Sequence, residues 1–510
     1  MKRSIRKLLI ANRGEIAVRV IRACRDMGLT SVAVYSEADS TAYHVRLADE
    51  AYLIGEALSS ESYLVHDKII DAAKKSGADA IHPGYGFLAE NATFAQRCAD
   101  DGIIFIGPSP RTISMLGDKI QARRAAIEAG LPVVPGAEID ISQLHTALET
   151  ADKVRFPILI KATAGGGGKG MRTVETAVEF EEAVKRASSE ALSAFGDGRV
   201  FIEHFLQRPR HIEIQILCDQ HGNCIHLGER ECSIQRRHQK LIEESPSPFV
   251  TEKLRQEMGE AAINIARSTG YVGAGTVEFM VDQEGHYYFL EVNTRLQVEH
   301  PVTEMVTGFD LVREQVRIAE GEALGYDQKD VKFNGHAIEC RICAEDPELG
   351  FVPSTGVLKN YRIPAGPGVR VDSGVVIFSE VPVYYDPLIA KLIVWGKDRD
   401  EAIRRTRRAL DEYRVSGLKT TLGFHEAVMD NESFRQGKLS TSFLAEEYPD
   451  NDFVQLDDTV RETAAIALAL DKFVRARKIA VSNHSSSKQG DSNWKQFHRR
   501  KNLRDFGGSR

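Results

Sequence analysis

Hydrophobic residues in the first hundred positions recur with two periods, one typical of helices and one typical of strands. Ile16, Val20, Ile21 and Cys24 have the spacing of a single helix face, whereas the flanking apolar runs are short and rich in β-branched residues. The predicted elements are strands at Lys7–Ala11, Ser31–Tyr35 and Ala78–Ile81 and helices at Glu15–Met27 and near Leu64–Lys75. Strands that alternate with helices predict a doubly wound parallel sheet.

The pattern changes after about residue 115. A new segment starts near Leu116, a predicted strand ends at Lys161, and strand-like alternation becomes more frequent from about Val200. Asp458–Lys478 has the spacing of an amphipathic helix, and the polar stretch Ser482–Gly490 is typical of a linker. We expect a multidomain α/β and α+β protein with an N-terminal doubly wound unit at 1–115, a central unit at 116–330, a mixed closing unit at 331–447 and a helical, basic tail at 448–510.

Net charge and the length of apolar runs argue against several classes of protein. The 66 Lys and Arg residues are outnumbered by 73 Asp and Glu residues, and a net charge of −7 is not that of a general nucleic-acid binder. The apolar run Leu8–Ala11 is shorter than a secretory signal requires, and a membrane span needs about 20 apolar residues. We expect a soluble, cytoplasmic protein that binds neither nucleic acid nor membrane.

The seven cysteines are scattered along the chain, which favours a reducing compartment. The CxxC pair Cys340 and Cys343 lies in a strand-like segment, whose alternation would place the two thiols on opposite faces. No second pair completes a zinc site, and no helix start lowers a thiol pKa. We therefore expect no zinc or redox site here.

Four consecutive glycines, Gly165–Gly168, precede Lys169. Such a run exposes backbone N–H groups that can contact phosphate oxygens, although it is also typical of flexible linkers. It lies between a strand that ends at Lys161 and the strand-like Met171–Val174, so we expect a hairpin tip that can close as a lid. The run is not a Walker A loop, which needs Ser or Thr after the lysine and then a helix, because Gly170 and a predicted strand follow Lys169. The turn at Asn12–Glu15 departs from GxGxxG, which argues against a dinucleotide-binding site there.

Acidic residues face each other in a second predicted hairpin. A two-residue turn at Glu284–Gly285 would pair Glu278 directly with Glu291, and a four-residue loop would keep both on one face. Asn293 lies two residues beyond Glu291 and so shares that face. Facing carboxylates repel each other unless a cation intervenes, and carboxylate and amide oxygens suit Mg²⁺ or Mn²⁺. Solvent-exposed glutamates are the alternative, but the neighbours of Glu278 are apolar.

Two further segments contain candidate binding groups. His211, Glu213 and Gln215 alternate onto one face of a predicted strand, and residues 230–240 mix arginines with Gln and His donors. A charge run of this kind usually marks a solvated face, and a site for an anionic substrate is the alternative.

Residues 293–301 continue directly from the predicted metal strand. Arg295 offers a planar fork for a carboxylate-like anion, and Gln297 adds a neutral donor. Glu299 could accept a proton if its neighbours keep it ionised. An ordinary surface loop is the alternative, but the position beside Glu278 and Glu291 favours a site.

Together these segments resemble the biotin carboxylases, which have the ATP-grasp fold. The matching segments span roughly residues 5–446 in the expected order: IANRGEIAVRVIRAC, IHPGYGFLAEN, FIGPS, MLGDK, IKATAGGGGKGM, RHIEIQIL, ERECSIQRRHQK, EESPSP, GAGTVEF, EVNTRLQVEHPVTEM, HAIECRI and YYDPLIAKLI. The resemblance implies a Rossmann-like N-terminal domain, an ATP-grasp region with a mobile lid at about 132–204, and a biotin carboxylase C-terminal domain.

The resemblance also implies a role for each matched residue. It implies ATP contacts from Lys119, Lys161, Gly165, Gly166, Gly167, Gly168, Met171, Glu203, Leu206, His211, Gln235 and His238. It implies metal ligation by Glu278, Glu291 and Asn293, bicarbonate binding by Arg295, Gln297 and Val298, and a catalytic group of Glu299 as base with Arg295, Lys240 and the biotin-binding Arg341. Two positions depart from the family: His204 stands where lysine is common, and Cys343 where asparagine is common.

The activity that the resemblance implies is ATP- and bicarbonate-dependent carboxylation of biotin through carboxyphosphate, with two Mg²⁺ or Mn²⁺ ions. Met-Lys occurs only at Met1-Lys2, so biotin would be a substrate carried on a separate biotin carboxyl carrier protein. The implied setting is a homodimer that works with a carboxyltransferase subunit in an acetyl-CoA or other acyl-CoA carboxylase, and a pyruvate or other 2-oxoacid carboxylase is the alternative. The intact motifs argue against another ATP-grasp ligase and against an inactive scaffold. The tail at 448–510 would dock a partner subunit or lack fixed structure.

Overall fold

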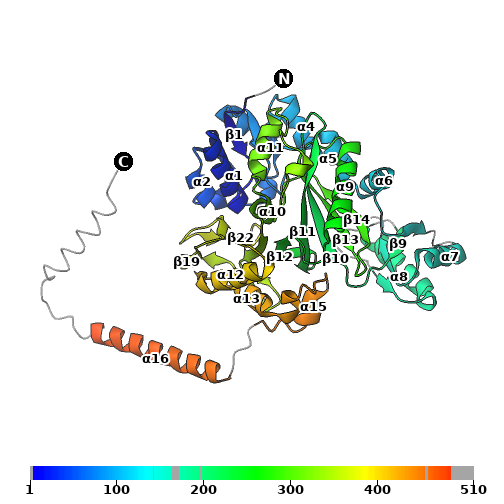
Figure 1. Ribbon diagram of the computed structural model, residues 1–510. Coiled ribbons are helices and arrows are strands. Elements are labelled where there is room, and N and C mark those ends of the chain that lie inside the picture. Colours follow the sequence, from blue (N-terminus) through cyan, green and yellow to red (C-terminus); the bar gives the residue numbers. More distant parts are fainter. Residues whose placement is uncertain are drawn as a thin grey trace. The chain divides into compact units, whose positions relative to one another are not determined.

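The computed structural model describes residues 4–139, 141, 143–162, 172–195, 198–453 and 458–483. The chain divides into two compact units, 1–453 and 454–510. All sheets found in the described residues lie in the first unit (Figure 1). None of the helices in the described part of the chain has the length and hydrophobicity that crossing a membrane requires.

A five-stranded parallel sheet occupies the N-terminal part of the first unit. Its strands are β1 (Lys7–Ile10), β2 (Thr30–Ser36), β3 (Glu50–Gly55), β4 (Ala80–His82) and β5 (Ile104–Phe105), in the order β3-β2-β1-β4-β5, and its helices are α1 (Gly14–Met27), α2 (Tyr43–Leu47), α3 (His66–Ser76) and α4 (Ala92–Asp100). Leu8 and Ile10 pack with α1, whereas Leu9 packs in the cluster that contains Ile70 of α3. Helices therefore cover both faces, which confirms the predicted doubly wound sheet.

A small antiparallel sheet follows two connecting helices, α5 (Pro110–Gly117) and α6 (Lys119–Glu128). Its strands are β6 (Gly136–Ile139), β7 (Ile158–Ala162), β8 (Arg172–Val174) and β9 (Val200–His204), in the order β6-β9-β7-β8, with α7 (Leu144–Val154) and α8 (Ala177–Phe195) packed against it. Ile158 pairs with Val174, so β7 and β8 form the predicted hairpin. The glycine run between them lies outside the described residues.

An eight-stranded antiparallel sheet forms the centre of the first unit (Figure 1). Its strands are β10 (Arg210–Cys218), β11 (Cys224–Arg236), β12 (Gln239–Ser245), β13 (Gly273–Val281), β14 (Tyr287–Asn293), β15 (His336–Cys343), β20 (Val369–Ser373) and β22 (Leu388–Gly396), in the order β14-β13-β10-β11-β12-β15-β22-β20. Ile242 of β12 pairs with Cys340 of β15, which joins two parts of the chain about 100 residues apart. The sheet is therefore shared by residues on both sides of position 330.

Helices cover this sheet and close its core. They are α9 (Glu252–Ser268), α10 (His300–Thr307), α11 (Leu311–Ala319), α12 (Arg399–Glu412), α13 (Leu422–Asp430), α14 (Glu432–Arg435) and α15 (Phe443–Glu447). Short strands pair in separate two-stranded sheets: β16 (Glu345–Asp346) with β17 (Val352–Pro353), β18 (Gly356–Val357) with β21 (Glu380–Val381), and β19 (Asn360–Arg362) with β23 (Arg414–Ser416). The second unit contributes α16 (Asp458–Asn483), which extends the predicted tail helix.

Two cysteines depart from the picture of scattered thiols. Cys218 and Cys224 are paired in register across β10 and β11, and the structure joins them by a disulfide. The sequence pattern did not predict this bond, because it depends on the register in which β10 pairs with β11. Cys340 and Cys343 are buried free thiols in β15.

Candidate active site

The hairpin of β13 and β14 brings the predicted acidic residues together. Glu278 pairs with Glu291, as predicted, and Thr276 pairs with Asn293. The predicted turn is wrong, because Asp282 N–H bonds to the His286 carbonyl at 2.9 Å and leaves a three-residue loop. A loop of odd length would shift Glu291 to the other face, but a bulge at Leu290 restores the pairing.

Protein donors surround the Glu278 carboxylate. Its Oε1 accepts from Lys240 Nζ at 2.9 Å, Asn293 Nδ2 at 2.7 Å and Gln297 Nε2 at 2.8 Å, and its Oε2 lies 2.8 Å from His211 Nε2. Burial alone would raise the pKa of Glu278, but Lys240 and His211 outweigh burial and hold it well below the ordinary range. The alternative of a solvent-exposed glutamate is therefore wrong.

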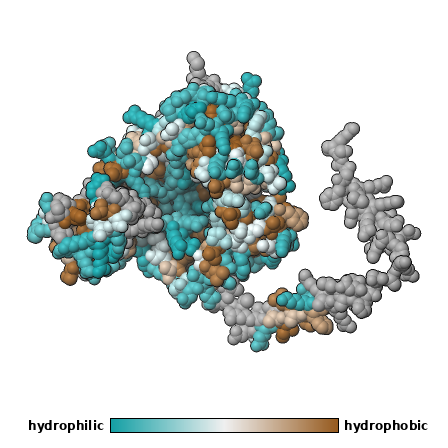
Figure 2. Space-filling model, turned by 180° about the vertical axis from the view of Figure 1, so that it is seen from behind, coloured by the Kyte–Doolittle hydropathy of each residue, from teal (hydrophilic) through white to brown (hydrophobic). Residues whose placement is uncertain are grey.

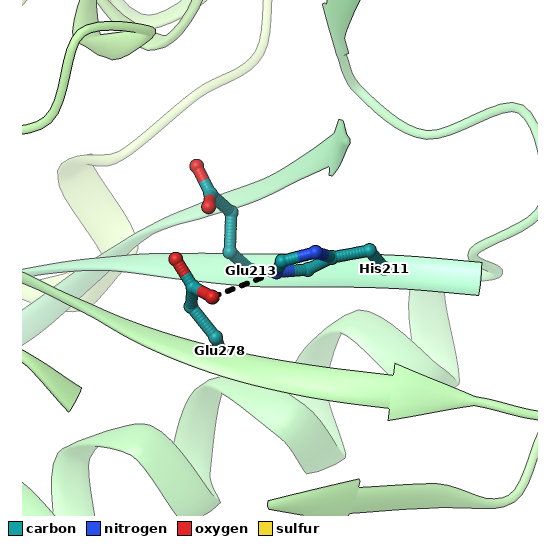
Figure 3. A group of neighbouring side chains, drawn as sticks. All are labelled: His211, Glu213 and Glu278. Atoms are coloured by element: carbon teal, nitrogen blue, oxygen red, sulfur yellow. Dashed lines mark hydrogen bonds and ion pairs between the residues drawn. The ribbon is translucent and has the colours of Figure 1, made fainter. Parts of the chain in front are cut away.

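Figure 3 shows that His211 of β10 and Glu278 of β13 point toward each other beside Glu213. The nitrogen and oxygen atoms that could bind a metal in these three residues lie within 4.8 Å of one another. Lys240 Nζ contacts both Glu213 and Glu278. Lys240 thus places a protein ammonium between these two carboxylates, and Arg230 also pairs with Glu213.

Glu299 is fixed between two cations. Its Oε1 lies 2.6 Å from Lys240 Nζ and its Oε2 2.9 Å from Arg341 Nη2. Burial would raise its pKa, but Lys240, Arg341 and Arg230 together lower it far below the ordinary value. The predicted base is therefore ionised, and each of its carboxylate oxygens contacts one cation.

The predicted anion-binding residues lie next to this pair. Arg295 Nε lies 2.8 Å from Glu90 Oε2, and its Nη2 donates to Asn293 Oδ1 at 3.1 Å. Val298 accepts a hydrogen bond on its carbonyl from Lys391 at 2.7 Å. A pocket of about 690 Å³ opens beside them, lined among others by Arg295, Val298, Arg341, Tyr85, Glu15 and Asp386. The structure thus brings Arg295, Val298 and Arg341 into one pocket with residues of the N-terminal sheet region.

Arg230 belongs to the charged segment 230–240, for which the sequence allowed either a solvated face or a site for an anionic substrate. Its side chain is fully buried, pairs with Glu213, and donates to four uncharged side chains: Gln215 at 2.6 Å and Thr303, Thr276 and Gln297 at 3.0 Å each. The interpretation of this segment as a solvated face is therefore wrong at Arg230. Its burial could have been inferred only from the pairing of β11 with β10, because the segment itself is polar throughout.

Lys119, Lys161 and Glu203, three of the predicted nucleotide residues, lie on α6, β7 and β9. Lys161 of β7 forms an ion pair with Glu203 of β9, so two residues expected to meet ATP bind each other. Lys119 starts α6 and lies close enough to Glu291 to oppose the rise in its pKa, which burial and Glu278 cause. His204 bonds through Nδ1 to the Arg155 carbonyl at 3.0 Å.

Three further predicted nucleotide residues lie after β9, on β11 and in the turn that follows β11. Leu206 is half-buried after β9, Gln235 is buried near the end of β11, and His238 is exposed in the turn between β11 and β12. Gly165–Gly168 and Met171 lie outside the described residues, so their predicted contacts stay predictions.

Three family models match successive parts of the chain. They are the biotin carboxylase N-terminal domain over residues 4–113, the ATP binding domain of the carbamoyl-phosphate synthase L chain over 118–326, and the biotin carboxylase C-terminal domain over 339–446. Together they include every predicted site residue named above.

Relatives and solved structures agree with these matches. The chain is 56% identical to biotin carboxylase of Nostoc sp. over 440 residues, which cover 86% of this chain and 98% of the relative. It is 53% identical to a pyruvate carboxylase subunit of Methanothermobacter thermautotrophicus over 476 residues, 93% of this chain and 96% of the relative.

A crystal structure of the biotin carboxylase domain dimer of Hydrogenobacter thermophilus 2-oxoglutarate carboxylase, in complex with MgADP, ADP and bicarbonate, is also similar. It has a TM-score of 0.81 and 48% identity, and the match covers 89% of this chain and all of that chain. The chain belongs to the biotin carboxylase family, and is thus an ATP-grasp ligase.

Proposed function

We propose that this protein carboxylates biotin in a reaction that consumes ATP and bicarbonate and proceeds through carboxyphosphate. The observation that carries the proposal is the position of Glu299 between Lys240 and Arg341, at 2.6 and 2.9 Å, beside the pocket. An anion bound in this pocket would lie near a base, Glu299, and near two cations, Lys240 and Arg341. The bicarbonate and MgADP bound to the related Hydrogenobacter domain support the same chemistry.

A divalent ion is part of the proposal. Glu278, Glu291 and Asn293 would hold Mg²⁺ or Mn²⁺, because all three offer oxygen atoms from one face of the hairpin. Burial and the charge of Glu278 raise the pKa of Glu291, so this carboxyl lies where a cation is needed. When bound with ATP, two such ions would neutralise phosphate charge.

The proposed first stage activates bicarbonate. Arg295, Gln297 and the backbone at Val298 would hold the anion, and Glu299 would remove its proton while its oxygen attacks the γ-phosphorus of ATP. Lys119, Lys161 and the glycine run would contact the phosphates, and Glu203, Leu206, His211, Gln235 and His238 would complete the nucleotide site. Each Glu299 oxygen contacts one cation and has a second acceptor site, so the carboxylate could take the proton while Lys240 and Arg341 stay in contact with it.

The proposed second stage transfers carbon dioxide. Carboxyphosphate would break down to carbon dioxide and phosphate in the closed site, where water is excluded. The phosphate would take the N1′ proton of biotin, Arg341 would stabilise the negative charge that develops on the ureido oxygen, and N1′ would attack carbon dioxide. Biotin would arrive on a separate carrier protein, and the carboxyltransferase subunit would pass the carboxyl group on.

The final acceptor of the carboxyl group separates two versions of this proposal. We favour a homodimeric subunit of an acetyl-CoA or other acyl-CoA carboxylase. A pyruvate or other 2-oxoacid carboxylase is the second candidate, favoured by the match to the Methanothermobacter pyruvate carboxylase subunit over 93% of this chain. Product analysis with reconstituted partner subunits would separate the two.

The proposal is tested by Glu299→Gln. We expect bicarbonate-dependent ATP cleavage and carboxylation of free biotin to fall by at least about 100-fold, because general-base catalysis contributes on that scale. Glu284→Gln, at an exposed site in the β13–β14 loop, is the matched control and should retain wild-type rates. Near-normal ATP cleavage in Glu299→Gln would contradict the base assignment, and a wild-type protein that bicarbonate and biotin do not stimulate would contradict the function.

A further inference from the structure

We propose that Glu243 is a positioning residue for Arg341, which it holds in place beside Glu299 and the pocket. This inference rests on the proposed function, in which Arg341 stabilises the enolate of biotin. Glu243 was not among the residues that the sequence singled out, and it lies on β12, whereas Arg341 lies on β15.

The guanidinium of Arg341 is shared between two carboxylates. Glu243 Oε1 accepts from Arg341 Nε at 2.6 Å and lies 2.5 Å from Nη2, while Glu299 Oε2 lies 2.9 Å from the same Nη2. Glu243 thus binds the inner edge of the fork at two nitrogens, whereas Glu299 binds one nitrogen. Both contacts converge on the single oxygen Oε1 and restrain this edge of the guanidinium, whereas Glu243 Oε2 has no hydrogen-bond partner among the described residues.

Sharing also limits how strongly Glu299 holds Arg341. If Glu243 lost its charge, Glu299 would be the nearest carboxylate left to the guanidinium, and Arg341 would move toward it and away from an incoming biotin. Glu243 therefore anchors one edge of Arg341 and leaves Nη2 able to exchange Glu299 for a ligand in the pocket. Arg341 lines that pocket, so the exchange needs only a short movement.

Glu339 provides a matched comparison within the same sheet. It pairs with Glu243 across β12 and β15 and is equally buried, yet neither of its carboxyl oxygens has a hydrogen-bond partner among the described residues. Burial raises the pKa of Glu339 well above the ordinary range and that of Glu243 to about 7, although Arg341 opposes both rises. The carboxyl group that contacts Arg341 is therefore that of Glu243, whereas Glu339 has no such contact among the described residues.

The test compares Glu243→Gln with Glu339→Gln in the full-length protein at pH 8. Two rates are measured for each: carboxylation of free biotin, and bicarbonate-dependent ATP cleavage without biotin. In Glu243→Gln we expect kcat/KM for biotin to fall about 10- to 100-fold, the scale of a lost charged hydrogen bond, while ATP cleavage stays within about threefold. Glu339→Gln should leave both rates unchanged, because its carboxyl oxygens have no hydrogen-bond partner among the described residues and do not contact Arg341.

Other outcomes are equally informative. An equal loss of both rates in Glu243→Gln would overturn the proposal, because it indicates a general structural role, and so would wild-type kinetics. If thermal melting shows that Glu243→Gln does not fold, Glu243→Asp is used instead, because it keeps the charge but moves it away from Arg341 by one methylene. It should then show the selective loss for biotin, and wild-type kinetics in Glu243→Asp would overturn the proposal. A wild-type protein without biotin carboxylation would instead refute the underlying function.

Discussion

A guanidinium removed from water is tolerated only where partners replace its hydration, and Arg230 has such partners on every side. Glu213 balances its charge, and Gln215, Thr276, Thr303 and Gln297 accept its other hydrogens. Gln297 also donates to Glu278, so Arg230 connects the centre of the sheet with the candidate metal and bicarbonate residues. We infer that Arg230 fixes this part of the site as much as it stabilises the fold.

Arg230→Met should therefore destabilise the protein strongly. It leaves Glu213 with Lys240 as its remaining cation and four polar groups without their donor, and we expect a loss of about 3–5 kcal/mol in the free energy of unfolding. Urea unfolding followed by circular dichroism measures the change. Lys185→Ala, which breaks an exposed ion pair with Glu181 at 2.5 Å, is the control and should cost at most about 0.5 kcal/mol. Equal losses in the two variants would contradict this account.

The predicted pairing of Glu278 with Glu291 is confirmed, because both residues lie in one hairpin. Glu278, Asn293 and Gln297 lie in or directly after one hairpin, and their contacts follow from its local pairing. Glu243 and Arg230 could not be assigned in this way. Their partners depend on how β12 meets β15 and how β10 meets β11, and a polar side chain in an isolated strand does not reveal which face will be buried.

At the scale of elements, a hairpin shows both the strength and the limit of pattern reasoning. The pairing of Glu278 with Glu291 was predicted correctly from a turn that does not form. The sequence predicted neither the three-residue loop nor the bulge at Leu290. These two features shift the register in opposite directions, so Glu278 still pairs with Glu291. Strand alternation specifies which residues share a face, but bulges depend on local geometry that alternation does not contain.

The link between β12 and α12 leads to a prediction about pH. Glu244 of β12 accepts from Arg399 at 2.7 and 3.0 Å and lies 2.6 Å from His336 Nε2. Burial would raise its pKa, but Arg399 and His336 lower it to about 2. Because the folded pKa lies below the unfolded value of about 4.3, the ionised carboxyl stabilises the fold fully above pH 5, and this contribution is lost as the pH falls toward 2.

Glu244→Gln should accordingly cost about 3 kcal/mol at pH 7, where Arg399 loses its buried partner. The difference from wild type should shrink steadily between pH 5 and pH 3. Urea unfolding midpoints at pH 7, 5, 4 and 3 measure it. A difference that stays constant over this range would show that lost packing, rather than lost charge, causes the destabilisation.

At the scale of the whole molecule, the two units differ in how they bury apolar residues. The first unit has its own cores on both sides of two large sheets, as the alternation of strands and helices predicted. In the second unit, α16 leaves Ile466, Leu468, Leu470 and Phe473 exposed by 59–63%, and Figure 2 shows apolar residues on its surface. We infer that contact with a partner chain would stabilise a helix with such a surface.

The proposed partner-docking role of the tail rests on this surface and on the comparison with relatives. The match to the Methanothermobacter pyruvate carboxylase subunit covers 93% of the chain, whereas the match to the Nostoc biotin carboxylase covers 86%. The longer match thus belongs to a protein whose name describes it as one subunit of a larger enzyme. Because the first unit has its own cores, removing the tail should separate catalysis from assembly.

Deletion of residues 455–510 should leave ATP- and bicarbonate-dependent carboxylation of free biotin within about twofold of wild type, because every candidate site residue lies in the first unit. Co-purification of the carrier and carboxyltransferase subunits should be lost. Leu470→Glu in the full-length protein places a charge on the exposed apolar surface and should weaken co-purification in the same direction, without changing the rate with free biotin. Assembly that survives both changes would contradict a docking role for α16, and a loss of free-biotin activity in the deletion would show that the two units are not independent.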